Sequence, residues 1–542
     1  MARGMFKVSL INPPERAMDG SYKYYLPFSL LYLAAYLESN GMSVDIVDEK
    51  AESSYFDSVK NRISNYSMSI AKRQPFTGSG LYSSLVDKII KKAESSSPNL
   101  IGISCMTREY NSVMRLANEL KGKSGIPIVV GGIHPSLYPE QFIYETSPVD
   151  FAVIGEGEET LLELAKYIES GKEDYDSIDG ISYLKNGMAR RTKVRTIMND
   201  LSISPMNVYQ KLNMRFYTRP HAFVTRHVRI SGVQIFTSRG CPYNCTFCSG
   251  SVIRKMNKFS RPIRYRPVRS VIEEIKFLKD RFAIDGFYIM DDTFCVDRAH
   301  AEEFCGELKN MKMNLVWACE TRSNLVDEAL LKKMKDSGLV QIDVGVESGS
   351  DEMLKEIEKG ITAADTMKIF SLARKHGVRA FASVMINLPN ETVEQLQDTI
   401  RLLEKLRPSG GVVGAAIPLP KTELFNKYFV HKLKGDSEIT ELFGWRLDHY
   451  RKSDRRFHLC GYDADFEDII NKLIIKHFLF TELRLGPWYW KVFLRSKRKL
   501  EYICSIVQGL VNVMGRIITR YRFKKIRAKI PNGWISKESA AL

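Results

Sequence analysis

Three cysteines on one short loop restrict what this chain can fold into more than any other feature of its sequence. Cys241, Cys245 and Cys248 stand in the order Cys-Pro-Tyr-Asn-Cys-Thr-Phe-Cys, directly after the apolar run at 233–236. A Cys-x3-Cys-x2-Cys loop that follows a strand can hold three irons of a four-iron, four-sulfur cluster. The spacing therefore predicts a strand that ends in a metal-binding loop.

The loop lacks a fourth metal ligand. Zinc and iron–sulfur sites normally take four protein donors, and the nearest candidates here are His227 and Cys295, neither of which is close in sequence. One metal position would stay open, so a substrate or cofactor could coordinate there. An open position is typical of a catalytic site, whereas a zinc site or a redox cysteine cluster remains the alternative.

The loop resembles the signature of the radical S-adenosylmethionine (radical SAM) superfamily, Cys-x3-Cys-x-aromatic-Cys, with Phe247 in the aromatic position. In that family the open iron binds the amino and carboxylate groups of SAM, and one electron from the reduced cluster cleaves SAM to a 5'-deoxyadenosyl radical. The resemblance implies a [4Fe-4S] cluster on Cys241, Cys245 and Cys248, SAM as a cofactor, and an external electron donor.

Size and composition indicate a multidomain protein of the cytoplasm. A chain of 542 residues exceeds one hydrophobic core, so about two to four domains are expected. The other six cysteines are dispersed and form no disulfide framework. The N-terminus has neither the apolar stretch nor the cleavage site of a signal peptide, which argues against export.

The first 190 residues alternate apolar runs with helical stretches. This alternation is typical of a doubly wound parallel sheet, whose ligands lie at the carboxyl ends of the strands. The expected strands are 8–11, 44–47, 100–104, 126–130 and 151–154, and two of the expected helices are 29–38 and 112–120. Residues 51–98 form a long Ser-rich insertion.

The turns after these strands carry a second resemblance. Gly-Gly-x-His-Pro at 131–135, followed by Gly-Glu-Gly-Glu at 155–158, resembles the cobalamin-binding domain that precedes many radical SAM cores. Glycine lets a large planar cofactor approach the backbone because no Cβ intervenes. The residues implied as cobalamin contacts are Ser104, Thr107, Gly131, Gly132, His134, Gly155, Glu156 and Gly157. A nucleotide-binding or vestigial Rossmann domain is the alternative.

The lower cobalt ligand departs from other cobalamin proteins. The Asp-x-His-x-x-Gly motif that supplies a histidine is absent, and Asn12-Pro13-Pro14 stands in its place. We therefore expect cobalamin without a protein histidine below cobalt. His134 is the only histidine of this domain, and we expect it to position its loop or to lie at the corrin edge rather than to ligate cobalt.

After the cysteine loop the chain repeats strand and helix, as a βα barrel does. Strand-like runs at 286–290, 315–319 and 341–346 each end in polar residues. Because the carboxyl ends of barrel strands meet at one rim, these residues should gather where barrel sites lie.

The polar strand ends also resemble the cobalamin-associated radical SAM branch, which carries Asp-Asp-Thr-Phe, Thr-Arg and Glu-Ser-Gly-Ser at these places. The resemblance implies Asp291 or Asp292 at the methionyl amino group, Arg322 at the carboxylate and Glu347 at the ribose hydroxyls. Guanidinium pairs bidentately with carboxylate, and a carboxylate accepts hydrogen bonds from ammonium or hydroxyl groups. Salt bridges across the barrel mouth are the alternative.

Two loops depart from the pattern of that branch. Asn-Leu-Pro-Asn-Glu-Thr at 387–392 stands where Gly-x-Pro-Gly-Glu-Thr is usual, and Pro-Leu-Pro-Lys-Thr at 418–422 stands where Pro-Gly-Thr is usual. Both changes replace glycine by a residue with a side chain. The shape of these loops is therefore open, whereas the SAM site is not affected.

The tail from 426 onward has no counterpart in the resemblance. Residues 481–530 contain thirteen Lys or Arg against two Glu, beside the run Trp488-Tyr489-Trp490 and the uncharged stretch 502–515. Fourteen uncharged residues are too few to cross a bilayer, but such a segment can lie in an anionic membrane interface. A helical cap with a solvated basic face is the alternative. Nucleic acid is disfavoured as a partner, because basic and stacking residues do not interleave along a groove.

These features predict an α/β chain in four parts. The parts are a doubly wound, Rossmann-like cobalamin domain at 1–190, a linker at 191–230, a partial (βα)6 radical SAM barrel at 231–425 and a basic helical region at 426–542.

The predicted function is that of a cobalamin-dependent radical SAM enzyme that methylates an unactivated carbon of a hydrophobic substrate, such as a lipid. The runner-up is a ring-forming cyclase or oxidase that acts on a lipid or a porphyrin. A binding protein with a structural cluster and a catalytically inactive sensor are the alternatives from other classes. We expect a cytoplasmic protein with peripheral contact at the inner face of the membrane, and the sequence assigns no catalytic residue beyond the cofactor contacts.

Overall fold

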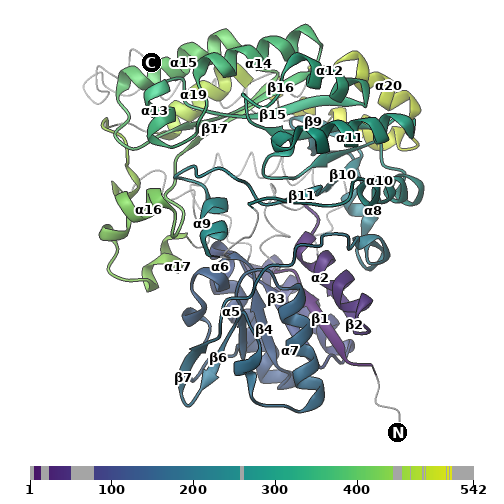
Figure 1. The fold of residues 1–542 in the computed structure, drawn as a ribbon, viewed down its shortest axis with the longest axis vertical. Coiled ribbons are helices and arrows are strands. Elements are labelled where there is room, and N and C mark those ends of the chain that lie inside the picture. The colour runs from purple at the N-terminus through teal and green to yellow at the C-terminus, as the bar shows by residue number, and fades with distance from the viewer. Residues whose placement is uncertain are drawn as a thin grey trace. The chain divides into compact units, whose positions relative to one another are not determined.

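A computed structural model of the chain divides into two units, each built on its own sheet with flanking helices (Figure 1). Unit 1 comprises Met1–Phe216, Val252–Arg266 and Leu433–Leu447, and unit 2 comprises Tyr217–Ser251, Pro267–Lys432 and Asp448–Leu542. Each unit thus combines segments that are distant in sequence. The structure describes residues 5–13, 24–49, 79–256, 262–443, 455–463, 466–478, 481, 484–507, 509–511 and 513–514.

Unit 1 contains a seven-stranded sheet in the order β2-β1-β3-β4-β5-β6-β7. The strands from β2 to β5 in that order run parallel, whereas β6 and β7 extend the sheet in antiparallel fashion. The five predicted strands are confirmed. The strands are β1 (Lys7–Ile11), β2 (Ser43–Val47), β3 (Leu100–Ser104), β4 (Ile128–Gly131), β5 (Phe151–Val153), β6 (Ile181–Lys185) and β7 (Met188–Arg191).

Helices cover this sheet as a doubly wound fold requires (Figure 1). α4 (Ser79–Ser95) and α5 (Tyr110–Ser124) share one apolar core with the strands. α2 (Phe28–Ser39) and α7 (Glu158–Ser170) contact each other. The predicted helices at 29–38 and 112–120 are therefore confirmed. The first part of the predicted Ser-rich insertion, up to residue 78, lies outside the described residues, and most of the rest forms α4.

Unit 2 is built on a six-stranded parallel sheet in the order β10-β13-β14-β15-β16-β17, which confirms the predicted partial barrel. Its strands are β10 (Gly232–Ile235), β13 (Gly286–Ile289), β14 (Val316–Thr321), β15 (Leu339–Glu347), β16 (Arg379–Ile386) and β17 (Gly410–Ala415). The connecting helices are α10 (Val268–Phe282), α11 (Arg298–Asn310), α12 (Glu328–Asp336), α13 (Asp351–Glu356), α14 (Ala363–Lys375) and α15 (Val393–Leu406).

Polar side chains determine where these helices begin. An N-cap side chain accepts a hydrogen bond from an N–H group of the first turn, which has no partner inside the helix. Asp297 caps α11 and Asp327 caps α12, while Thr362 and Thr392 form capping boxes at α14 and α15. Thr392 also ends the loop at 387–392, so the start of α15 fixes one end of that loop.

The two loops that depart from the family pattern keep the backbone conformation that glycine favours. Asn387, Asn390 and Lys421 occupy the places of the usual glycines, and their φ angles are 63°, 56° and 64°. Asparagine tolerates this left-handed region better than most residues. The side chain of Asn387 also donates hydrogen bonds to Ala416 O (3.1 Å) and Phe457 O (2.8 Å). The exchange of glycine for asparagine thus keeps the turn and adds a tie to a distant segment.

The C-terminal part of unit 2 packs on the barrel. α19 (Phe466–Phe478) covers β17 so closely that a Cβ on Gly411 would lie 2.3 Å from Phe478. α20 (Pro487–Arg495) is followed by a helix at 499–507 that continues at 509–511 and 513–514. Tyr489 of α20 and Tyr502 of the next helix are buried against the hairpin at 221–230. These contacts confirm a helical C-terminal region, and its described part packs on the barrel as in the alternative of a helical cap.

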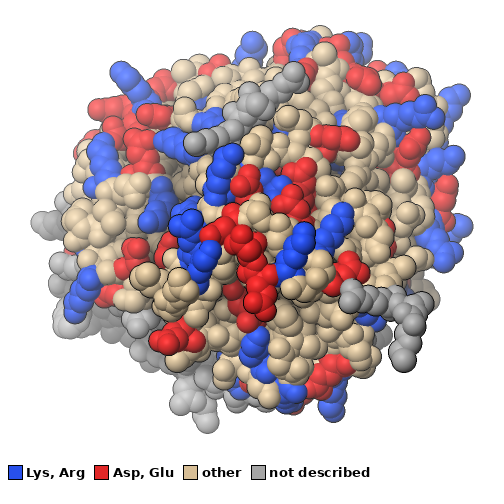
Figure 2. Space-filling model, turned by 60° about the horizontal axis from the view of Figure 1, so that its bottom comes forward, with Lys and Arg blue, Asp and Glu red and all other residues tan. Residues whose placement is uncertain are grey.

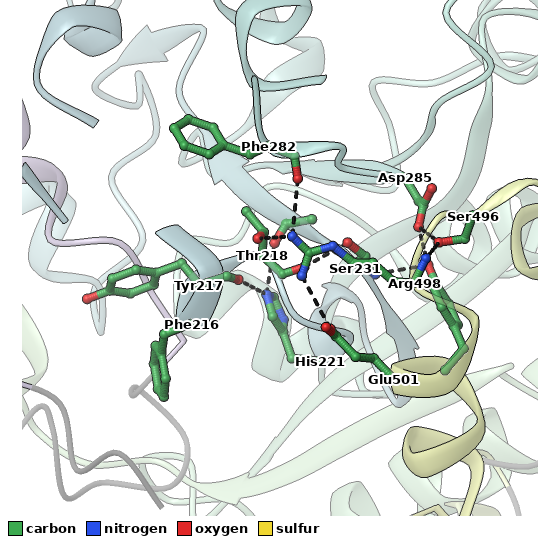
Figure 3. A network of polar contacts seen from close by, with 12 residues as sticks. Phe216, Tyr217, Thr218, His221, Ser231, Phe282, Asp285, Ser496, Arg498 and Glu501 are labelled. Atoms are coloured by element: carbon green, nitrogen blue, oxygen red, sulfur yellow. Dashed lines mark hydrogen bonds and ion pairs between the residues drawn. The ribbon is translucent and has the colours of Figure 1, made fainter. Parts of the chain in front are cut away.

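A polar network fastens this C-terminal part to the amino end of the barrel (Figure 3). Tyr502 OH donates to Asp285 Oδ2 (3.0 Å) and accepts from Ser231 N (3.0 Å). Ser496 Oγ also donates to Asp285 Oδ2 (2.6 Å). We call Ser231, Asp285, Ser496 and Tyr502 the floor network. Each of the four has a hydrogen-bonded partner within it, so the network stabilises the attachment of the C-terminal helices.

The basic side chains behind the net charge of +17 do not form one continuous positive patch on the face that Figure 2 shows, because Lys and Arg alternate there with Asp and Glu.

Across the parts of the chain that the structure describes, we find no helix whose length and apolar character would let it cross a membrane.

Candidate active site

The cysteine loop follows β10, the first strand of the barrel sheet. Cys245 is buried, Cys241 is half-buried and Cys248 is exposed. Thr246 N donates to Ile357 O (3.1 Å), which ties the middle of the loop to the turn after α13. The loop is therefore held at the carboxyl end of the strands, where the sequence predicted it.

The three thiols do not surround a single point. Among the described residues, no three His, Cys, Asp or Glu side chains stand where they could hold one metal ion. In a four-iron cluster each thiolate binds a different iron, so the ligands border the whole cluster. Three thiolates on one loop can each bind a different iron of such a cluster.

The two aspartates after β13 have different surroundings. Asp291 is buried and accepts four hydrogen bonds of 2.5–3.1 Å from the N–H and hydroxyl groups of Thr237 and Ser238. Burial raises the pKa of Asp291 to about 6, although these hydrogen bonds oppose the shift. Asp292 is exposed. Asp291 thus braces the start of the cysteine loop, and Asp292 is the better candidate for the amino group of SAM.

Arg322 directly follows β14 and has unused hydrogen-bond donors. Its Nη1 lies 3.6 Å from Cys245 Sγ, and its guanidinium stacks on Tyr243 with Cζ 3.7 Å from the ring centroid. Nε and Nη2 are buried and have no partner among the described residues. An unpaired buried donor costs about 1–3 kcal/mol, so these atoms indicate an anionic ligand. The carboxylate of SAM has the charge and the planar shape for this place.

Glu347 ends β15 with a φ of 58° and forms a buried ion pair. Its Oε1 accepts from Lys359 Nζ at 2.6 Å, and the two side chains are 9% and 10% exposed. Desolvation lowers the pKa of Lys359, but the charge of Glu347 outweighs it, and the pKa is raised. Gly345 makes the pair possible, because a Cβ there would lie 2.5 Å from Glu347 Oε1. Lys359 Nζ also lies 5.8 Å from the centroid of Phe247.

A polar cluster surrounds Asp343 at the middle of β15. Asp343 accepts hydrogen bonds from Arg226 Nε (2.9 Å), Tyr288 OH (3.0 Å) and Gln341 Nε2 (2.7 Å). Glu320 is exposed but in register with the buried Asp343 on the neighbouring strand, so both side chains lie on the same face of the sheet. Desolvation, together with the charge of Asp343, raises the pKa of Glu320 to about 7.

Sequence analysis missed Lys359, Asp343 and Glu320. Lys359 lies after α13 without a motif around it. Asp343 stands inside β15, where no motif marks it. Glu320 belongs to the polar residues that follow the run at 315–319, but the sequence gives it no role of its own. The alternation of inward and outward positions along a strand could have identified both, because a charged residue in a barrel strand must face either the lumen or the helices.

The predicted cobalamin contacts gather at the carboxyl edge of the sheet in unit 1. They follow or end three neighbouring strands: Ser104 and Thr107 at β3, Gly131, Gly132 and His134 at β4, and Gly155, Glu156 and Gly157 at β5. A Cβ on Gly131 would touch only Val153 at 3.8 Å, so a ligand can approach its backbone. Gly132 has a φ of 112° and its Cβ would lie 2.8 Å from Cys105 O, so packing alone requires glycine there.

Glu156 is engaged by another side chain of unit 1. Arg264, which is 4% exposed, donates to Glu156 Oε1 (2.5 Å) and Oε2 (2.9 Å), and also to Met198 O. This bidentate pair fixes the turn between β5 and α7. The backbone of the turn remains the part that a cofactor could contact.

His134 lies in the short helix α6 (Ile133–Leu137), where the sequence led us to expect a loop. The ring is fully buried, and Nε2 lies 3.0 Å from Gln141 Oε1. Desolvation lowers the pKa of His134 to about 4, although the Gln141 contact opposes the shift, so the imidazole is neutral at pH 7. Three aromatic rings surround it with centroids 5.4–5.6 Å away: Tyr110, Tyr138 and Phe142. A buried, neutral ring of this kind suits a positioning role.

Two family models match the chain. Residues 235–403 match the radical SAM superfamily, and residues 19–165 match the B12 binding domain. The first range contains the cysteine loop and the strand ends of the barrel, and the second contains the carboxyl edge of the sheet in unit 1.

Known proteins agree with both matches. An uncharacterized methyltransferase of Pyrococcus horikoshii is 31% identical over 352 residues, which cover 64% of this chain and 72% of that protein. The anaerobic magnesium-protoporphyrin IX monomethyl ester cyclase of Rubrivivax gelatinosus is 25% identical over 410 residues, which cover 74% of this chain and 66% of the cyclase.

Among solved structures, the radical SAM methyltransferase TsrM of Kitasatospora setae, with cobalamin and a [4Fe-4S] cluster bound, has a similar fold. Its TM-score is 0.60 at 19% identity, over 78% of this chain and 77% of TsrM. The fold, the two matched domains and the level of identity lead to one assignment. The chain belongs to the B12-binding radical SAM enzymes, whose cofactors are a [4Fe-4S] cluster, SAM and cobalamin.

Proposed function

We propose that this enzyme transfers a methyl group to an unactivated carbon of a hydrophobic substrate. The observation that carries the proposal is the barrel mouth, where the unpaired N–H groups of Arg322 lie next to the thiol of Cys245. This arrangement supports a carboxylate ligand beside the cluster loop. The name of the Pyrococcus horikoshii relative supports methyl transfer as the reaction.

In this proposal the residues of the mouth divide the work of holding SAM. Arg322 binds the carboxylate, Asp292 receives the amino group, and Glu347 accepts from the ribose hydroxyls while Lys359 holds its carboxylate in place. Cys241, Cys245 and Cys248 hold the cluster. When bound, the cluster supplies the electron that cleaves SAM, and cobalamin supplies the methyl group. As a radical SAM enzyme, the protein needs an external electron donor.

Cobalamin lies, in this proposal, at the carboxyl edge of unit 1 without a histidine of the protein below cobalt. The burial and the low pKa of His134 support a positioning role instead. Electron paramagnetic resonance of the cobalt(II) form tests this. Spectra of protein grown with ¹⁴N- or ¹⁵N-histidine should be identical, and a change in the hyperfine pattern would show a histidine ligand.

Isotope-labelled SAM tests the reaction itself. The anaerobically reconstituted enzyme would be incubated with a reductant, a lipid extract and SAM that carries a deuterated methyl group. Methyl transfer should carry the label into a product and release S-adenosylhomocysteine beside 5'-deoxyadenosine. The variant with Cys241, Cys245 and Cys248 all changed to Ala should form neither cluster nor cleavage products.

Ring formation or oxidation is the second candidate, because the Rubrivivax gelatinosus relative is a cyclase. A cyclase would cleave SAM to 5'-deoxyadenosine and leave the labelled methyl group in methionine. The same experiment therefore separates the two reactions.

We also propose that the enzyme is cytoplasmic and meets its substrate at a membrane surface, with the region from 488 to 529 as the contact. Residues 515–529 lie outside the described part of the chain. Within the described part, Trp490 is 46% exposed and Leu494 68% exposed, next to the basic residues Lys491 and Arg495. Indole and aliphatic side chains beside basic ones favour an anionic membrane interface.

We also propose that the chain divides into four parts, with boundaries at residues 190, 230 and 425.

A further inference from the structure

We propose that a cavity at the amino end of the barrel binds the anionic headgroup of a membrane lipid. The proposal rests on the proposed membrane contact and assigns it a specific site. The cavity has a volume of about 290 Å³, near the lower end of the range of ligand pockets. Its lining comes from the turns before β13, β14 and β15, from the ends of α11 and α12, and from α20. It includes Asp285, Lys309, Lys312, Asn314, Asp336, Trp488, Lys491 and Arg495.

The cavity is distinct from the SAM site. Asp285, Leu315 and Gly338 line it, and each directly precedes a strand of the barrel sheet. The cysteine loop and Arg322 follow strands, so they lie at the opposite end. Because barrel chemistry occurs at the carboxyl ends of the strands, a ligand in this cavity would not meet the reacting groups.

The lining is predominantly cationic. Four basic side chains, Lys309, Lys312, Lys491 and Arg495, face two carboxylates. In the floor network the carboxylate of Asp285 already accepts hydrogen bonds from Ser496 (Figure 3) and from Tyr502. The other carboxylate, that of Asp336, lies 3.5 Å from Lys309. Lys312 and Lys491 are exposed, and the described residues offer no carboxylate that pairs with either. An anion is therefore the complementary ligand.

Apolar groups in the same lining favour a lipid over a free anion. Leu308, Met313 and Val492 contribute to the wall, and the indole of Trp488 is half-buried there. A soluble phosphate would contact the basic side chains and leave this apolar wall unused. A lipid brings a phosphate together with a glycerol and acyl region, which can contact both.

The outer face of α20 presents apolar side chains beside the cavity. Trp488, Lys491 and Arg495 are spaced by three and four residues and share the side that lines the cavity. Trp490 and Leu494 lie on the outward side of the same helix and are 46% and 68% exposed. Lys491 therefore separates the exposed apolar side chains from the cavity, as a basic residue at a membrane interface does when its charge reaches a headgroup.

The following helix continues this apolar character. Its exposed large side chains recur at intervals of three and four residues, which places them along one face. They are Leu500, Ile503, Val507, Leu510 and Met514, with exposures of 78%, 48%, 48%, 47% and 57%. The opposite face is buried through Tyr502 and Val513. The floor network holds this helix on the barrel, so the cavity and the apolar face belong to one unit.

Vesicle co-sedimentation of the full-length holoenzyme tests the proposal. The probes are phosphatidylcholine vesicles with and without phosphatidylglycerol, at low and high salt. The cavity variant combines Lys312→Glu with Lys491→Glu. A control variant combines Lys276→Glu with Lys368→Glu, two exposed lysines of α10 and α14 that do not line the cavity. Both variants change the net charge equally, and both should retain reductive SAM cleavage.

We expect the wild type and the control to bind phosphatidylglycerol vesicles within about twofold of each other, and the cavity variant to bind at least about tenfold more weakly, since each basic residue near the surface contributes about 1 kcal/mol. Equal weakening of both variants, or binding of all three forms alike, would overturn the cavity site and leave the membrane contact intact. No binding by any form would overturn both proposals. If inorganic phosphate binds the cavity but the protein does not bind vesicles, the ligand is a soluble anion, and the proposal of a lipid headgroup is overturned.

Discussion

The two ends of the barrel in unit 2 differ in whether their buried polar groups have hydrogen-bond partners. At the amino end, the members of the floor network are hydrogen-bonded to one another. At the carboxyl end, Arg322 Nε, Arg322 Nη2 and Glu391 Oε1 are buried without a partner among the described residues. A satisfied network stabilises a fold, whereas each unpaired buried group costs about 1–3 kcal/mol. The comparison teaches that the buried polar groups of the mouth are arranged for ligands, whereas those of the floor network stabilise the fold.

The largest effect that would sharpen this comparison is expected from Arg322→Gln. The change removes the charged donors that the SAM carboxylate would use, so SAM should bind about 100-fold more weakly, which corresponds to ~3 kcal/mol. Titration calorimetry of the reconstituted enzyme measures this, and cluster absorbance should stay unchanged. Arg298→Gln on the surface of α11 is the matched control. Unchanged SAM affinity in Arg322→Gln would mean that the unpaired donors serve another purpose.

A second effect concerns Glu391 at the mouth and depends on pH. Burial raises its pKa to about 7 from 4.5, despite hydrogen bonds from Tyr462 OH and the loop backbone. A carboxyl group with a raised pKa in the folded state stabilises the protein below pH 4.5, and this stabilisation is lost as the pH rises through 7. The shift corresponds to about 3 kcal/mol.

The variant Glu391→Gln cannot titrate, so its free energy of unfolding should fall less than that of the wild type between about pH 5 and pH 8. Urea unfolding across this range measures the difference in unfolding free energy between the two proteins at each pH. The contributions of Glu320 and Asp291 are the same in both proteins and cancel in this difference. Glu394→Gln, at an exposed position of α15, serves as the control. Parallel stability curves for Glu391→Gln and the wild type would exclude a titrating Glu391.

Strands β1 to β5, β10 and β13 to β15 and the cysteine loop could be predicted because they depend on local patterns, whereas β6, β7 and β17 were not predicted. Apolar runs with β-branched residues identify strands such as Leu100–Ser104, and fixed spacing identifies the cysteine loop. The ion pair of Glu347 with Lys359 could not be predicted, since it joins a strand end to a residue beyond a separate helix. The floor network joins residues up to 271 positions apart, which no motif records.

The loop at 387–392 shows a different limit of prediction. The loss of the usual glycines left the shape of this turn open, and the structure shows that Asn387 and Asn390 keep the positive φ. The reason is physical: the short amide side chain tolerates the left-handed region and finds hydrogen-bond partners there. Sequence alone could not show that Phe457 would supply one of these partners.

At the floor, Tyr502→Phe should cost about 2 kcal/mol of unfolding free energy, because it leaves Ser231 N without its partner and removes one donor from Asp285. Thermal or urea unfolding measures the loss. SAM affinity and cleavage should not change, since the floor lies at the end of the barrel away from the cysteine loop. Tyr428→Phe, which removes a hydroxyl bonded to the exposed Glu356, is the control. A loss of SAM affinity in Tyr502→Phe would contradict the division of roles between the two ends.

The smallest effect is expected from Lys421→Gly, which tests whether the mouth stores backbone strain as well as unpaired polar groups. A lysine with a φ of 64° is held in a conformation that costs about 1–2 kcal/mol, and glycine removes that cost. Glycine also loses more conformational freedom on folding, by about 0.5–1 kcal/mol, so the net gain in stability should be below about 1 kcal/mol. Asn387→Gly is the matched comparison: asparagine tolerates the left-handed region, so glycine relieves less strain there, and the change removes the hydrogen bonds to Ala416 O and Phe457 O, so it should destabilise the protein. If both glycine variants gain stability in urea unfolding, the side-chain ties of Asn387 contribute little, and backbone conformation alone accounts for the shape of the mouth.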